Sequence, residues 1–156
     1  MSAEADRDFA GTVHGTSVVI DGRAVLILGA SGAGKSDLAL RLIDRGAALL
    51  ADDYTHLARE DDTVIGSAPE RTAGLIEVRG LGLVSMPLVA RAPVALVIQA
   101  AEITPERYPD PLPTCTYCGL AVPMLTLNPL EASAPIKIEL ALRHISRQTG
   151  GWEPMR

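Results

Sequence analysis

Residues 25–53 read VLILGASGAGKSDLALRLIDRGAALLADD, and three kinds of pattern follow one another in this segment. The apolar run 24–28 is typical of a buried strand, and it ends at a glycine-rich loop. Residues 36–45 then carry apolar side chains at helical spacing, and Gly46 stands where a helix C-cap belongs. A second apolar run, 47–51, predicts another buried strand. The order strand, loop, helix, strand indicates an α/β fold.

The loop itself, GASGAGKS, matches G-x-x-x-x-G-K-[ST], the Walker A or P-loop motif. Its glycines let successive backbone N–H groups point at phosphate oxygens, and the helix that follows adds its positive dipole end. Lys35 is expected to reach the β- and γ-phosphates, and the Ser36 hydroxyl to bind Mg²⁺. A flexible glycine loop is the alternative, but the flanking strand and helix favour phosphate binding. The predicted nucleotide-binding residues are Gly29, Ala30, Ser31, Gly32, Ala33, Gly34, Lys35 and Ser36.

Two aspartates follow the second apolar run and belong beside the glycine loop. Asp52 and Asp53 would lie at the carboxyl edge of a parallel sheet, where ligands of α/β proteins bind. One carboxylate could hold Mg²⁺ and the other could take the proton from an attacking hydroxyl. Neighbouring side chains of a strand point to opposite faces, so different roles are expected. A turn at the end of the strand is the structural alternative.

Two further segments bring polar residues to strand ends. His14 stands in Val13-His14-Gly15, and a lone histidine of this kind is either structural or catalytic. Glu77 and Arg79 share one face of a predicted strand, because side chains alternate with a period of two. They could bind a metal and a phosphate respectively, or form a surface ion pair of little energetic value.

The remaining pattern predicts a single P-loop domain with a mixed, largely buried sheet and flanking helices. Further strands are expected at 13–20, before an Asp21-Gly22 hairpin turn, and at 63–68, 75–78, 94–100 and 122–127. An amphipathic helix is expected over 134–146, with Ile138, Leu142 and Ile145 on one side. The proline-rich stretch 104–113 is expected to hold no regular element. The predicted boundaries are a flexible lead over 1–11, the kinase domain over 12–148 and a tail over 149–156.

Composition excludes several classes of function. The chain has 156 residues, of which 14 are Lys or Arg and 19 are Asp or Glu, giving a net charge of −5. This charge and the 3% aromatic content argue against binding to nucleic acid or to an anionic membrane. The pair Cys115 and Cys118 is too small for a disulfide scaffold and is interpreted as reduced, incidental thiols. With no signal pattern or membrane-spanning run in the sequence, a cytoplasmic location is expected.

Four segments together carry a family resemblance: Val13-His14-Gly15, the glycine loop, Ala51-Asp52-Asp53, and IEVRGLG at 76–82. Their order and spacing resemble the catalytic domain of HPr kinase/phosphorylase, the bacterial enzyme that phosphorylates a serine of the phosphocarrier HPr in the phosphotransferase system. The resemblance runs from about residue 12 to about residue 100, and the E-[IV]-R-G-L-G part is the most specific to the family. It implies a Mg-ATP-dependent protein-serine kinase with an HPr-like protein as substrate, and a homo-oligomer such as the hexamers the family forms.

The resemblance also implies a role for each candidate residue. Asp53 resembles the general base that takes the proton of the carrier serine, with Asp52 beside it, and His14 matches a catalytic histidine. Glu77 matches a metal ligand that acts together with Ser36. Arg79 lies in the stretch required for both directions of the reaction, and Lys35 matches the lysine that binds phosphate.

Two departures separate this sequence from the longer family members. Only a short lead precedes His14, so the sequence resembles short forms that lack the N-terminal domain. The family arginine that precedes the C-terminal helix falls on Ala132 when Glu139 is aligned with the helix glutamate. Kinase activity is therefore expected, whereas the reverse phosphorylase reaction is in doubt, since only Arg143 or Arg147 could substitute for that arginine.

Two other functions stay open on the residues alone. A nucleotide-sensing module would bind ATP without transferring phosphate, although such a module needs no base of the Asp53 type. A small-molecule P-loop kinase often closes an arginine-rich lid over its phosphates, and the proline-rich stretch offers only Arg107 for that purpose.

Overall fold

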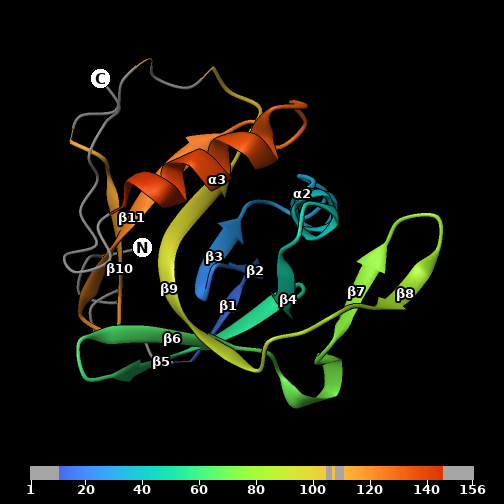
Figure 1. Cartoon of the computed structure of the whole chain (residues 1–156), viewed down its shortest axis with the longest axis horizontal. Helices are drawn as coiled ribbons and strands as arrows, with labels where there is room; N and C mark the ends of the chain where they lie inside the picture. Colours follow the sequence, from blue (N-terminus) through green and yellow to red (C-terminus); the bar gives the residue numbers. More distant parts are fainter. Residues whose placement is uncertain (1–10, 105–106, 108–110, 146–156) are drawn as a thin grey trace.

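A computed structural model describes residues 11–104, 107 and 111–145 of the chain. A curled, mixed sheet of nine strands carries two helices, and a separate two-stranded hairpin extends from it (Figure 1). The path of the large sheet is β1-β5-β6-β9-β3-β2-β4, and β11 also pairs with β9 and with β10. The elements are β1 Gly11–His14, β2 Thr16–Ile20, β3 Arg23–Leu28, α2 Lys35–Asp44, β4 Ala48–Ala51, β5 Tyr54–Glu60, β6 Thr63–Ser67, a 3₁₀ turn Glu70–Thr72, β7 Leu75–Val78, β8 Gly82–Ser85, β9 Arg91–Ala100, β10 Thr114–Tyr117, β11 Leu120–Leu127 and α3 Ala134–His144.

Local signals place the central elements where the sequence predicts them. The β2–β3 hairpin turns at Asp21 and Gly22, whose φ angles of 51° and 77° suit a tight two-residue turn. Helix α2 ends before Gly46, which has a φ of 113° and donates its N–H to the carbonyl of Ile43. The predicted order of strand, glycine loop, helix and strand is therefore present.

The strand predicted over 13–20 is in fact two strands that meet at Gly15. β1 pairs with β5, whereas β2 pairs with β3 and β4, so the chain changes partners at this residue. A Cβ atom at Gly15 would lie 3.0 Å from the Ile27 carbonyl oxygen and 3.0 Å from the side chains of Leu26 and Leu28. A larger residue at this crossing would force these neighbours to shift, and the corner presents His14 at the edge of the sheet.

Strand direction corrects one further expectation. β3, β9 and β11 are parallel, but β2 runs antiparallel between β3 and β4. β3 and β4 therefore point the same way without being neighbours. The glycine loop after β3 and the aspartates after β4 do share one edge, as predicted, but this edge belongs to a mixed sheet and also contains the start of β2.

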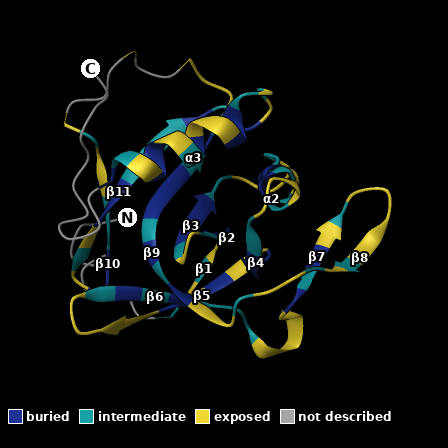
Figure 2. Cartoon of the chain, viewed as in Figure 1, coloured by how far each residue is buried: buried dark blue, intermediate teal, exposed yellow. Residues whose placement is uncertain are grey.

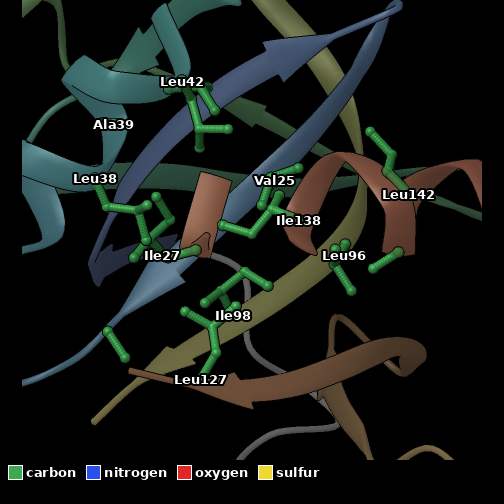
Figure 3. Packing of buried hydrophobic residues seen from close by; sticks show 14 of the residues in the cluster. Val25, Ile27, Leu38, Ala39, Leu42, Leu96, Ile98, Leu127, Ile138 and Leu142 are labelled. Carbon is green, nitrogen blue, oxygen red and sulfur yellow. The ribbon is translucent and has the colours of Figure 1, made fainter. Parts of the chain in front are cut away.

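The core occupies both faces of the sheet, which confirms that the sheet is largely buried. On β3, Val25 and Ile27 pack toward the two helices, and Ala24 and Leu26 pack on the opposite face. Figure 3 shows side chains of α3, β3 and β9 meeting on the helix side. Ile138, Leu142 and Ile145 are buried as predicted, and each such side chain contributes about 1.5–3 kcal/mol. Figure 2 shows the exposed residues of α3 on its outer face.

Some elements were not predicted from the sequence. These are β5, β8, β10 and the first residues of β9, where Pro93 lies opposite Ile65 of β6. β7 and β8 form the hairpin that carries the 76–82 segment. The predicted lead, residues 1–11, lies outside the described residues except for Gly11, which begins β1. The predicted tail, residues 149–156, lies wholly outside them.

Two smaller expectations concern the cysteines and the membrane. Among the described residues, neither Cys115 nor Cys118 forms a disulfide bond. In the ranges that the structure describes, neither α2 nor α3 is long and apolar enough to cross a bilayer.

Candidate active site

The site forms where the ends of β3 and β4, the start of β2 and the β7–β8 hairpin come together. A cavity of about 470 Å³ opens at this place. Its lining includes most of the residues predicted from the sequence, namely His14, Ser31, Gly32, Gly34, Lys35, Ser36, Asp53, Glu77 and Arg79. Thr16, Asp37, Leu40, Val78 and Leu130 also line it.

The glycine loop forms one wall. Gly32 and Gly34 have φ angles of 81° and 100°, which glycine adopts without steric cost. Lys35 begins α2 and is only 7% exposed, and its ammonium donates to the carbonyls of Gly29 at 2.8 Å and Ala30 at 3.0 Å. Within the described part of the chain, no carboxylate pairs with Lys35. A nearly buried cation with no acidic partner, next to a glycine-rich loop at the start of a helix, favours an anionic ligand.

Asp52 holds the site together from behind the cavity. Its carboxylate accepts hydrogen bonds from the hydroxyls of Thr16 at 3.0 Å and Ser36 at 2.7 Å, and from the backbone N–H of Glu77 at 2.9 Å. Asp52 is 8% exposed. One carboxylate thus connects β2, the start of α2 and β7, and little of its hydrogen-bonding capacity is left for a proton or a substrate.

Asp53 is placed quite differently from its neighbour. Its side chain is 64% exposed, and its Oδ1 lies 2.8 Å from Nε2 of His14. Since a carboxylate only accepts hydrogen bonds, this ring nitrogen is the donor. The His14 ring also packs on the ring of Tyr54, with centroids 5.2 Å apart. The two aspartates therefore do have different environments, as their adjacent positions predict.

The backbone at Asp53 is strained as well as anchored. Its φ is 65°, and the N–H of Tyr54 donates to the Asp52 carbonyl at 2.7 Å, so Asp53 is the centre of a three-residue γ-turn. The Asp53 N–H donates to the Thr16 hydroxyl at 3.2 Å, and its carbonyl accepts the Gly15 N–H at 2.8 Å. Such turns are rare, and in this protein Gly15 and Thr16 hold one in place at the cavity.

The structure brings Glu77 and Arg79 to the same cavity. Both are exposed at the end of β7, and in the described ranges no ion pair joins them. The structure therefore gives no support to the surface ion-pair alternative for these two residues. Gly29, Ala30 and Ala33 do not line the cavity, although the first two accept the Lys35 ammonium.

The oxygen donors around the cavity suit Mg²⁺ better than a metal held by the protein alone. No cluster of three or more His, Cys, Asp or Glu side chains in the described residues could hold a metal ion. The Ser36 hydroxyl and the Asp52 and Glu77 carboxylates are the hard oxygen ligands that Mg²⁺ prefers. Mg²⁺ is commonly held by one or two such groups together with substrate phosphates, so the donor set fits a metal that arrives with a nucleotide.

Sequence reasoning missed Thr16, Tyr54 and Leu130. Thr16 directly follows Val13-His14-Gly15, and Tyr54 directly follows Ala51-Asp52-Asp53. Their positions next to these predicted site segments were a weak signal that they belong to the site. Leu130 comes from the connection between β11 and α3, and no local pattern marks it.

The chain is similar to known proteins in both sequence and structure. Residues 8–151 match the model of the HPr Serine kinase C-terminal domain. The HPr kinase/phosphorylase of Geobacillus thermodenitrificans is 44% identical over 108 residues, which are 64% of this chain and 35% of that protein. That of Lactobacillus acidophilus is 32% identical over 156 residues, covering 91% of this chain and 48% of that protein. The chain thus spans less than half the length of these relatives.

A solved structure is also similar. It is the Hpr(Ser) kinase/phosphatase from Coxiella burnetii, which superposes with a TM-score of 0.74 and 33% sequence identity, over 85% of this chain and 88% of that one.

Proposed function

This chain belongs to the HPr serine kinase C-terminal domain family, and on that premise we propose that it is a Mg-ATP-dependent protein-serine kinase acting on an HPr-like phosphocarrier. One observation carries the proposal. The exposed pair of His14 and Asp53 faces the same cavity as the buried ammonium of Lys35, which has no carboxylate partner among the described residues. A base for a hydroxyl and a cation for phosphate are the two groups that phosphoryl transfer to serine requires.

The glycine loop would hold the triphosphate of ATP. Its amides and the start of α2 supply hydrogen bonds and a positive dipole. Lys35 exchanges its two carbonyl partners for phosphate oxygens, and its charge then stabilises the negative charge that develops during transfer. Arg79, at the opposite side of the cavity, adds a second positive charge near the transferred group.

Ser36 and Glu77 would hold the metal, with Asp52 fixing both from behind. When bound, Mg²⁺ supplies charge neutralisation between the β- and γ-phosphates. Asp52 accepts the Ser36 hydroxyl and the Glu77 N–H, so it keeps the loop serine and the β7 backbone at a constant separation. Asp52 is therefore a positioning residue, whereas Asp53 meets the substrate.

In the transfer step, the carrier serine oxygen attacks the γ-phosphorus while its proton passes to the Asp53 carboxylate. The new O–P bond forms as the bond from the γ-phosphorus to the bridging oxygen breaks, and ADP leaves with that electron pair. His14 donates its Nε2–H to one Asp53 oxygen and leaves the other for the incoming hydroxyl. Positioned bases of this kind contribute about 10²–10⁴-fold to a rate.

The test is an intact-mass assay of the carrier. The protein is incubated with Mg-ATP and a serine-containing HPr-like carrier, and the expected product is a carrier heavier by one phosphoryl group. Asp53→Asn and Lys35→Ala should each lower the rate by at least about a hundredfold. Asp61→Asn and Arg71→Ala are controls, because Asp61 is also an aspartate with positive φ, and Arg71 is an exposed cation that does not line the cavity.

The other outcomes separate the alternatives. Binding of Mg-ATP that Lys35→Ala weakens, without any carrier phosphorylation, would contradict the kinase assignment and favour a nucleotide-sensing module. Stimulation of ATP turnover by a small metabolite instead of the carrier would favour a small-molecule kinase. Inorganic phosphate added to the phosphorylated carrier tests reversal, and we expect little, because Ala132 occupies the position of the family arginine.

A further inference from the structure

The connection from β11 to α3, residues 128–133, is fastened to the helix that follows the glycine loop. Arg41 of α2 donates to the carbonyl of Glu131 at 3.1 Å and also to the carbonyl of Pro129. Asp37, one turn earlier on α2, accepts the Arg41 Nε at 3.1 Å and fixes its direction. The connection thus cannot move away from α2 without losing these hydrogen bonds.

Within the connection, further contacts fix the backbone of Leu130. The Leu130 N–H donates to the Asn128 side-chain oxygen at 2.9 Å, and the Glu131 N–H donates to the Asn128 carbonyl at 3.3 Å. The Glu131 side chain pairs with Lys137 of α3 at 2.9 Å. The chain therefore builds a well-anchored turn around a single apolar residue.

The Leu130 side chain nevertheless stays 61% exposed. It lies beside the glycine loop, since a Cβ atom at Gly34 would be 3.5 Å from its Cδ2. Leu130, Leu40 and Val78 are the large apolar residues that line the same cavity as Lys35 and Ser36. A fixed turn that keeps an apolar side chain exposed to water beside the glycine loop favours a ligand with an apolar part.

From this geometry and the proposed nucleotide binding, we infer that the Leu130 side chain packs against the nucleoside of the bound nucleotide. The loop amides and Lys35 hold the phosphates, and the sugar and base extend from them over Gly34 onto Leu130. An aliphatic side chain contacts the face of a base but forms no hydrogen bond with its edge. Affinity from Leu130 is therefore independent of which purine is bound.

The test compares Leu130→Ala with wild type by isothermal titration, using Mg-ATP, Mg-GTP and Mg-tripolyphosphate as three separate ligands. Leu130→Ala should weaken Mg-ATP and Mg-GTP about tenfold, as expected for losing part of a buried leucine contact. Its affinity for Mg-tripolyphosphate, which has no nucleoside, should not change. Ile136→Ala is the matched control, because Ile136 is an exposed aliphatic residue of α3, 43% exposed, that does not line the cavity.

Each contrary result has its own meaning. Unchanged Mg-ATP affinity in Leu130→Ala, with clear binding to wild type, would overturn this inference and leave the proposed kinase intact. An equal loss for Mg-tripolyphosphate would also overturn it, because Leu130 would then act on the loop and not on the nucleoside. A much higher affinity of the wild type for one of Mg-ATP and Mg-GTP would contradict a base contact made by an aliphatic side chain alone. No Mg-ATP binding to wild type would contradict the proposed function itself.

Discussion

At the scale of single residues, Thr16 connects the two aspartates of the site. Its hydroxyl donates to Asp52 and accepts the N–H of Asp53, and the residue is fully buried. Thr16→Val keeps the shape but removes both hydrogen bonds, so it should lower the free energy of unfolding by about 1–3 kcal/mol. We expect kcat to fall more than the KM for ATP changes.

Thr16→Ser is the control for this prediction, because it retains the hydroxyl. Urea unfolding and steady-state kinetics of both variants check it. Equal behaviour of the valine and serine variants would mean that the hydroxyl positions nothing.

Asp53 combines a chemical role with an unusual backbone, and two substitutions separate these properties. Asn tolerates a positive φ, whereas Ala does so at a cost of about 1 kcal/mol. We expect Asp53→Asn and Asp53→Ala to be equally inactive, but only Asp53→Ala to show the lower free energy of unfolding. Carrier phosphorylation and denaturant melts measure the two effects. Identical stability of the two variants would contradict the strained turn.

At the scale of elements, the corner between β1 and β2 depends on Gly15. Gly15→Ala would push a Cβ atom against the Ile27 carbonyl and two leucine side chains, and overpacking of this kind costs about 1–3 kcal/mol. Because the corner carries His14, activity should fall together with stability. Thermal melts check this against Thr12→Ala, an exposed position on β1, which should change stability by less than about 0.5 kcal/mol.

The β10–β11 hairpin makes a prediction about thiol chemistry. Burial raises the pKa of Cys118, so less thiolate is present at any given pH than in the unfolded chain. We expect iodoacetamide at pH 8 to modify Cys118 much more slowly in the native protein than in urea. Peptide mass spectrometry after timed quenching measures both rates, and equal rates would show that this hairpin opens readily.

The elements also show which parts of the fold can be predicted from the sequence. β3, the β2–β3 turn and the end of α2 were predictable because an apolar run, Asp21-Gly22 and Gly46 carry their signals locally. β5 was not, since only Thr55 and Leu57 of its residues are buried and it becomes a strand by pairing with β1 and β6. The same limit applies to the site. Thr16 meets Asp52 across 36 positions, and such a contact leaves no local pattern.

At the scale of the whole molecule, nucleotide binding should be visible as stability. A ligand at a hundred times its Kd stabilises the folded state by about 2.7 kcal/mol, which is about 5–10 °C in Tm for a chain of this size. We expect Mg-ATP to raise Tm by this amount in wild type and in Arg71→Ala, but not in Lys35→Ala. Differential scanning fluorimetry measures the shift, and a shift retained by Lys35→Ala would contradict the assigned phosphate site.

The antiparallel β2 between β3 and β4 has a consequence for how this protein can change. Adjacent strands lie about 4.8 Å apart, so the ends of β3 and β4 are separated by two strand spacings, or about 10 Å, and the side chains of Ser36 and Asp52 meet across this gap. Backbone hydrogen bonds between neighbouring strands fix this distance, so point mutations in the loops cannot increase it. New substrate preferences can therefore evolve at the rim, at Leu130 or at the exposed tip of the β7–β8 hairpin, without moving the groups that transfer phosphate.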